Sequence, residues 1–287
     1  LGSNPCLPKE KSSVRRVERR RKKLKQRIIT GLIAAAIFIP FVVYGNLPFT
    51  IGVYGLALVA LYEILRMKGI KIYSLPGLIG TLIVFSILMP VDWATYIEDL
   101  TTYSKYELLT IATILLLAYS VVVKNHFTFD EIGFIILSAL YIGIGFYYLI
   151  TTREAGLMYI IYALLVVWST DSGAYFTGRK LGKNKLWPEI SPNKTIEGFV
   201  GGIIIAVILA CIMQIIVPFN VSWTYFIVVT VFSSIFGQLG DLVESAIKRH
   251  YNVKDSGWIL PGHGGILDRF DSLLFVLPLL NLLHFVS

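Results

Sequence analysis

The chain has 287 residues, of which 55% are hydrophobic and only 15% are charged, and its mean hydropathy is +0.70. Soluble globular proteins carry about 25% charged residues, so this composition excludes most soluble classes and predicts an integral membrane protein. The net charge of +8 could indicate nucleic-acid binding, but 11 of the 26 basic residues lie between Lys9 and Arg27. The remaining chain is nearly neutral, which indicates a topology signal and no nucleic-acid partner.

Residues 1–27 form a basic tail, and we expect its first residues, 1–13, to be in part vector-derived and leave those out of the fold prediction. The apolar run at 28–45 is longer than a secretory signal core and lacks a clear cleavage site, so an uncleaved first span is preferred. Further segments have the roughly 17 to 25 residues that cross a bilayer. In chain order they are 49–66, 75–91, 107–123, 131–150, 157–178, 196–217, 223–247 and 266–286.

The distribution of positive charge tests this count of nine spans, because Lys and Arg are retained on the cytoplasmic side. With the N-terminus inside, 24 basic residues fall in cytoplasmic segments, and only Lys105 and Arg153 fall outside. The sequence therefore predicts an all-α polytopic membrane protein with a cytoplasmic N-terminus and its C-terminus outside. The predicted division is a tail at 1–27, five spans within 28–150, and a catalytic region of four spans within 151–287. The two cysteines, Cys6 and Cys211, imply no disulfide framework.

Acidic residues occur inside, or at the cytoplasmic ends of, three C-terminal spans. A carboxylate in hydrocarbon costs about 2.5 kcal/mol or more, so each one needs a cation, a water-filled cavity or a metal. In the eighth span, Asp241, Glu244 and Lys248 share one face, because they are spaced i, i+3 and i+7. The other acids are Asp171 in the sixth span, and Asp268 and Asp271 at the start of the ninth.

Residues suited to phosphate binding lie in two cytoplasmic connections, at about 179–195 and 248–265. Mg²⁺ takes one or two carboxylates together with phosphate oxygens and water, while fixed cations and close backbone amides neutralise phosphates. The chain has no P-loop motif and no zinc-ligand spacing, which argues against a P-loop ATPase. The cations are Lys194, Lys248, Arg249, Lys254 and Arg269, and the glycines that permit close approach are Gly262, Gly264 and Gly265.

The stretch from Ser245 to Asp271, SAIKRHYNVKDSGWILPGHGGILDRFD, resembles the signature of phosphatidate cytidylyltransferases, also called CDP-diacylglycerol synthases. DSGAYFTGRKLGKNKL and SPNKTIEG, between Asp171 and Gly198, are similar to the same family, whereas the first five spans match only in hydropathy. The resemblance implies Mg²⁺-dependent transfer of CMP from CTP to phosphatidate, with release of pyrophosphate. It also implies a multi-pass protein of the cell membrane, of the prokaryotic inner-membrane type, with its active site facing the cytoplasm.

The resemblance also assigns expected roles to residues. Asp241 and Asp268 would hold Mg²⁺, with Lys194 and Lys248 as the catalytic cations. Further candidate metal ligands are Asp171, Glu244 and Asp271, and a second metal or monovalent ion stays open. Phosphate contacts are expected from Ser191, Asn193, Arg249, Lys254, His263, Gly264, Gly265 and Arg269. The expected partners are CTP, phosphatidate and membrane lipids, with a homodimer left open.

Simpler interpretations stay open beside these. Asp171 could merely hydrogen-bond within the bundle, and Lys248 could be an interfacial anchor. Gly198 and Gly202 are interpreted as helix-packing residues, and Gly237 as space for a neighbouring helix or a ligand. For the whole protein, the alternatives are a polyprenol-type lipid kinase, a cytidylyltransferase for another anionic lipid, and an ion-coupled transporter. The acids are expected near one face of the membrane, and the sequence has no repeated half. Both observations argue against a transporter.

Overall fold

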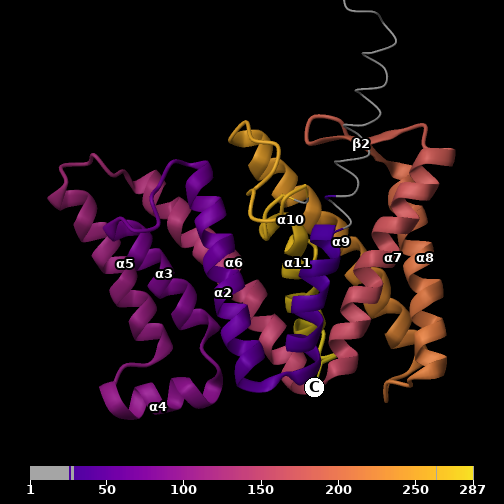
Figure 1. Ribbon diagram of the computed structural model, residues 1–287, viewed down its shortest axis with the longest axis horizontal. Coiled ribbons are helices and arrows are strands. Elements are labelled where there is room, and N and C mark those ends of the chain that lie inside the picture. Colours follow the sequence, from indigo (N-terminus) through magenta and orange to yellow (C-terminus); the bar gives the residue numbers. More distant parts are fainter. Residues whose placement is uncertain (1–25, 27–28, 263, 287) are drawn as a thin grey trace, which may run out of the picture.

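The computed structural model describes residues 26, 29–262 and 264–286. Successive helices run in alternating directions between the two ends of one bundle (Figure 1). A helix over Ile29–Tyr44 comes first. It is followed by α2 (Asn46–Met67), α3 (Leu75–Leu88), α4 (Val91–Thr101), α5 (Lys105–Val122), α6 (Phe129–Ala155), α7 (Leu157–Leu181), β1 (Lys185–Trp187), β2 (Ser191–Thr195), α8 (Ile196–Ile216), α9 (Trp223–His250), α10 (Leu267–Phe270) and α11 (Leu273–Leu282).

The helices are those of a multi-pass membrane protein, which confirms the prediction from the composition. Six of them are long and apolar enough to cross a membrane, and the number rises to seven if α3 and α4 form one bent span. The helices Ile29–Tyr44 and Leu273–Leu282 lie in the predicted first and ninth spans, but each has only 10–17 residues. Every predicted span thus contains helix, while the count of nine crossings and the sides of the termini remain predictions.

The predicted third span, 75–91, ends where the chain turns sharply. α3 and α4 are bent by 116° relative to each other, and Pro90 lies between them. Proline disfavours helical geometry in the residue before it, and Met89 accordingly has a ψ of 119°. α4 has no buried residue and lies across the end of the bundle opposite the β-hairpin (Figure 1). The sequence patterns did not separate this helix from its neighbours.

Glycines set the distance between neighbouring helices in the C-terminal region. A Cβ at Gly202 would lie 2.8 Å from the carbonyl oxygen of Thr170, and one at Gly198 would lie 2.8 Å from that of Ala174. These contacts join α8 to α7 and confirm the packing interpretation of both glycines. A Cβ at Gly237 would lie 3.2 Å from Val276 on α11, so a helix, and not a ligand, occupies the space beside it.

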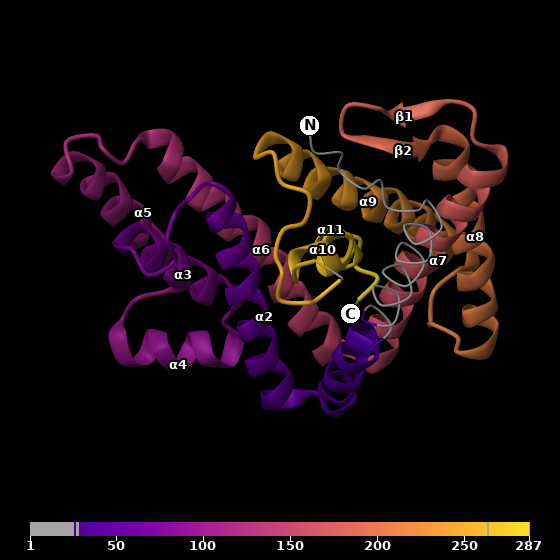
Figure 2. The same cartoon turned by 45° about the horizontal axis from the view of Figure 1, so that its top comes forward.

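Two features of the C-terminal region differ from the prediction. β1 and β2 form an antiparallel hairpin in which Lys185 pairs with Thr195 and Trp187 pairs with Ser191, so the all-α prediction holds for the bundle but not for this connection. The hairpin lies at the same end of the bundle as the segment that follows α9 (Figure 2). The predicted ninth span is also divided, since α10 ends at Phe270 and α11 begins at Leu273.

Candidate active site

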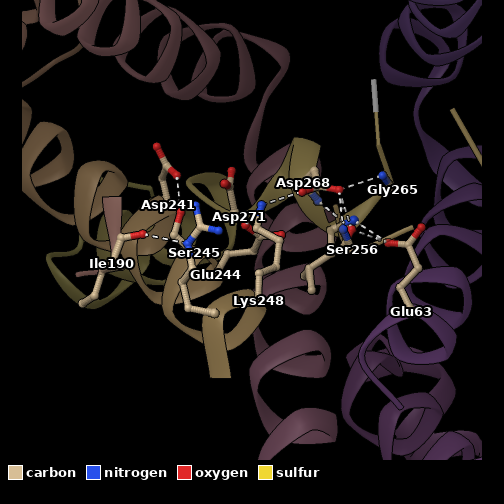
Figure 3. A network of polar contacts seen from close by, with 12 residues as sticks. Glu63, Ile190, Asp241, Glu244, Ser245, Lys248, Ser256, Gly265, Asp268 and Asp271 are labelled. Atoms are coloured by element: carbon tan, nitrogen blue, oxygen red, sulfur yellow. Dashed lines mark hydrogen bonds and ion pairs between the residues drawn. The ribbon is translucent and has the colours of Figure 1, made fainter. Parts of the chain in front are cut away.

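A network of polar side chains joins α9 to α10 and extends to α2 (Figure 3). Its centre is Lys248, which forms ion pairs with Glu244, one turn earlier on α9, and with Asp268 on α10. The Lys248 Nζ lies 2.7 Å from Asp268 Oδ1, and the side chains of Glu244 and Asp268 are only 1% and 6% exposed. Because an unpaired buried charge is strongly destabilising, Lys248 is the counterion of two buried acids and more than an interfacial anchor.

The Asp268 carboxylate also holds the loop that precedes α10. Its Oδ2 accepts hydrogen bonds from the Ser256 backbone N–H at 2.8 Å, the Ser256 hydroxyl at 2.7 Å and the Gly265 N–H at 2.8 Å. α10 is not one of the helices long enough to span a membrane. Burial raises the pKa of Asp268, but the hydrogen bonds from Lys248, Gly265 and Ser256 outweigh it and lower the pKa to about 2. Asp268 is therefore charged at neutral pH, and a ligand could reach its Oδ1 only by displacing Lys248.

Two of the predicted close-approach glycines, Gly264 and Gly265, lie against this carboxylate. Gly264 has a φ of +87°, and a Cβ there would lie 2.5 Å from Asp268 Oδ2. Gly264 also accepts a hydrogen bond from the Leu260 N–H at 3.1 Å, which closes the loop on itself. The glycines therefore let the backbone approach an acid of the protein itself, and phosphate contact by Gly264 and Gly265 stays a prediction.

A second group of acids surrounds Asp241 on α9. Asp241 Oδ2 lies 2.7 Å from the Nζ of Lys194 on β2, and Asp241 Oδ1 accepts a hydrogen bond from the Ser245 hydroxyl at 3.4 Å. Asp171 on α7 and Asp271, just before α11, both interact electrostatically with Asp241 and with each other. Acids far apart in the sequence are therefore brought within electrostatic range of one another.

The remaining predicted residues differ in how directly they join this site. Arg249 donates a hydrogen bond from its Nε to the carbonyl oxygen of Ile190 at 3.3 Å, which ties the hairpin turn to α9. Arg269 is exposed and lies within electrostatic range of Asp171. Ser191 is half-buried on β2, Asn193 and Lys254 are exposed, and His263 lies outside the described residues.

Two residues of the network, Glu63 and Ser256, were missing from the predicted site. Glu63 on α2 is fully buried, with 0% exposure, and it accepts hydrogen bonds from the backbone N–H groups of Ile266 and Leu267. The sequence did contain a signal for it, since Glu63 is a carboxylate inside the predicted span 49–66. The cost of an acid in hydrocarbon, applied to every span, would have found it.

The donor set fits a hard divalent cation that arrives with phosphates. Among residues 26, 29–262 and 264–286, no three His, Cys, Asp or Glu side chains are grouped to hold a metal ion by themselves. Mg²⁺ needs only one or two carboxylates when phosphate oxygens and water complete its octahedron. Asp241, together with Asp171 or Asp271, offers such oxygen donors.

A separate cavity of about 320 Å³ lies between the start of α2, α4 and the end of α6. Its one basic side chain, Arg153, is already engaged, because it donates hydrogen bonds to the carbonyl oxygens of Val42 and Val43. The other charged residues that line it are Asp92 and Glu154. This cavity therefore lacks the free cations that phosphate binding needs.

Fold and site together define a multi-pass membrane protein in which cations are paired with oxygen donors at one end of the bundle. This combination of groups is typical of an enzyme that acts on phosphates. The sequence profile of the cytidylyltransferase family matches residues 25–287. A phosphatidate cytidylyltransferase of Bacillus subtilis is 58% identical over 263 residues, which cover 91% of this chain and 97% of that protein. One of Staphylococcus saprophyticus is 51% identical over 260 residues, covering 91% and 98%.

The chain therefore belongs to the cytidylyltransferase family, and it is an enzyme. The resemblance seen in the C-terminal half is confirmed. The expectation that the first five spans match only in hydropathy is wrong, since the match begins at residue 25 and runs through the whole bundle.

Proposed function

We propose that this enzyme transfers CMP from CTP to phosphatidate, giving CDP-diacylglycerol and pyrophosphate. The observation that carries the proposal is the acid group around Asp241, with Lys194 paired directly to it. Asp171 and Asp271 belong to the same group, and Lys248 and Arg269 act on it electrostatically. Such an arrangement suits a substrate that brings both phosphates and a divalent cation. The names of the Bacillus and Staphylococcus relatives support the choice of phosphatidate as acceptor.

The reaction requires anions to be brought together. A phosphate oxygen of phosphatidate attacks the α-phosphorus of CTP, and the bond from that phosphorus to the oxygen bridging to the β-phosphorus breaks, so that pyrophosphate leaves with the electron pair. The second pKa of a phosphate monoester is about 6, so the nucleophile is already mostly ionised at neutral pH. No strong general base is needed, and positioning and charge neutralisation carry the catalysis.

The residues have separable roles in this scheme. Lys194 and Lys248, now paired with acids, would turn to the phosphates of the substrates, while Arg249, Arg269 and Lys254 would add positive potential around them. Asp241 would be the main ligand of Mg²⁺, and Asp268 would contribute through Oδ1. When bound, Mg²⁺ would neutralise the charge of the nucleotide phosphates.

The placement of the site fits a lipid acceptor that stays in the bilayer. Asp171 and Asp241 lie within the membrane-type helices α7 and α9, and Asp241 pairs with Lys194 of the polar hairpin, which lies at one end of the bundle (Figure 2). By the positive-inside rule, this end, with its many Lys and Arg residues, would face the cytoplasm. CTP would then arrive from the cytoplasm and phosphatidate from the inner leaflet.

The decisive experiment follows the phosphorus atoms of CTP. Purified protein in detergent is given phosphatidate, Mg²⁺ and CTP labelled at either the α or the γ phosphorus. We expect α label in the lipid and γ label in pyrophosphate. Transfer of γ label to a lipid would instead identify a kinase. Transfer of neither label would overturn the proposal and leave the ion-coupled transporter as the alternative to test.

A further inference from the structure

We propose that Glu63 of α2 is a positioning residue for this site, which holds the loop 256–267 so that Asp268 and Lys248 keep their relative positions. The inference rests on the proposed function for its kinetic test, but its geometry is independent of the reaction. It assigns a role in the site to a residue of the N-terminal half.

The contacts of Glu63 all go to one segment of the chain. Its Oε1 accepts from the Ile266 N–H at 3.0 Å, and its Oε2 accepts from the Leu267 N–H at 2.9 Å and from the Ser256 hydroxyl at 3.1 Å. Figure 3 shows the carboxylate pointing toward Ser256 from the side opposite Asp268. Removal of such an acceptor leaves buried donors without partners, which destabilises the segment that carries them.

Ser256 connects Glu63 to the active site. The hydroxyl that contacts Glu63 also lies 2.7 Å from Asp268 Oδ2, and the Ser256 N–H donates to the same Asp268 oxygen at 2.8 Å. Asp268 Oδ1 in turn pairs with Lys248. A displacement of Ser256 therefore changes the position of Asp268, and with it the position of Lys248.

The loop is shaped to receive this carboxylate. A Cβ on either Gly257 or Gly265 would collide with the carboxylate oxygens of Glu63. Arg66, one turn further along α2, donates from Nη2 to the Ser256 carbonyl oxygen at 3.3 Å. α2 thus holds Ser256 with an acceptor at position 63 and a donor at position 66, which lie on one face of the helix because they are spaced i, i+3.

The kinetic test compares Glu63→Gln and Glu63→Asp with wild type. We expect Glu63→Gln to lower kcat by about 100-fold, the loss that a displacement of about 1 Å can cause. The KM for CTP should change far less, since Glu63 touches no substrate. Glu63→Asp should recover part of kcat, because it keeps a carboxyl group, although at a shorter reach. Wild-type kcat in Glu63→Gln would overturn the inference and leave the proposed function intact.

Glu131→Gln is a matched control. Glu131 also accepts a backbone hydrogen bond, from Thr128 at 2.6 Å, but in an exposed helix cap of α6 far along the chain from the loop. Its kinetic constants should equal those of wild type. A loss in Glu131→Gln as large as that in Glu63→Gln would also overturn the inference, because any carboxylate of the N-terminal half would then have the same effect.

A structural test separates this inference from the proposed function. Amide hydrogen exchange of residues 256–267 should be faster in Glu63→Gln than in wild type, whether or not either protein transfers CMP. Unchanged exchange in this segment would overturn the positioning role. If Glu63→Gln does not fold, Gly257→Ala serves as the second variant, because its new methyl group must push the Glu63 carboxylate away from the loop. Unchanged amide exchange of residues 256–267 in Gly257→Ala would then overturn the positioning role.

Discussion

Asp241 and Asp268 have the same chemistry but different surroundings. The Asp241 side chain is 34% exposed and pairs with Lys194, whereas the Asp268 side chain is 6% exposed and pairs with Lys248. Asp268 also accepts hydrogen bonds from Ser256 and Gly265, so it stabilises the loop in addition to its proposed role in catalysis. Asp241 has neighbouring acids that repel it. The two residues should therefore respond differently to the same substitution.

We expect both Asp241→Asn and Asp268→Asn to abolish CMP transfer, but only the second to destabilise the protein. Asp268→Asn weakens several hydrogen bonds to a charged group, each worth about 1.5–3 kcal/mol, whereas Asp241→Asn also relieves repulsion from Asp171 and Asp271. Transfer of α label from CTP and the thermal midpoint in detergent measure the two effects. Asp255→Asn, an exposed acid of the same loop, is the control. Full activity in either variant would remove that residue from the proposed metal site.

Gly264 allows a second test at the scale of one residue. Gly264→Ala must place a side chain at a φ of +87° and 2.5 Å from Asp268 Oδ2. Gly69→Ala faces a similar φ of +80°, but nothing lies within 4 Å of its Cβ. The left-handed conformation alone costs about 1–2 kcal/mol, so both variants should lose that much stability. Only Gly264→Ala should also lose CMP transfer; equal activity in the two would argue against the role of the Asp268 contact.

The hairpin β1–β2 is the element whose position depends most on charges. Two contacts attach it to α9, namely the Lys194–Asp241 ion pair and the hydrogen bond from Arg249 to Ile190. The hairpin also packs against α7 and α8, and the Lys194 side chain is only 26% exposed. The ion pair and the hydrogen bond therefore fix where the hairpin lies relative to α9, while its attachment to the bundle does not depend on them alone.

We expect Lys194→Met to release the hairpin locally. Amide exchange of residues 185–195 should rise severalfold, while the thermal midpoint should hardly change, because the lost pair contributes about 1 kcal/mol at most. Lys185→Met is the control, since Lys185 is an exposed lysine of the partner strand. An equal rise in both variants would show that the ion pair does not hold the hairpin.

At the scale of the whole molecule, the bundle separates polar residues into two ends. The hairpin lies at one end and α4, which carries Asp92, Glu98 and Asp99, lies at the other (Figure 1). Lys185 and Lys194 lie in this hairpin, and Lys248 and Arg249 lie in the last turn of α9 at the same end. The positive-inside rule then assigns that end to the cytoplasm.

Single cysteines test this orientation in intact cells. In a variant with Cys6→Ser and Cys211→Ser, a membrane-impermeant thiol reagent should label Thr102→Cys, after α4, without disruption of the membrane. Lys185→Cys, in the hairpin, should be labelled only after the membrane is opened. The reverse pattern would place the active site outside and contradict the proposed use of cytoplasmic CTP.

The sequence predicted more of the elements than of their contacts. Apolar runs located most of the helices, because this signal is local, but they did not separate α4 from its neighbours. The spacing of Asp241, Glu244 and Lys248 placed them on one face, but could not show that Lys194 pairs with the first and Lys248 with the second. The division of the last span before α11 and the short strand pair were missed, since neither has a strong periodic pattern.

The sequence by itself determined that this chain is a helical membrane protein of the cytidylyltransferase family, because composition, hydropathy and motif identity need no three-dimensional information. The tertiary structure decided which acid meets which cation, and it brought Glu63 to a loop about 200 positions later, with Ile266 203 positions after Glu63. Although Glu63 is itself a local signal, its contact with Ile266 leaves no periodic or local trace in the sequence. It exists because buried backbone N–H groups need acceptors, and the packing of α2 beside the loop supplies one.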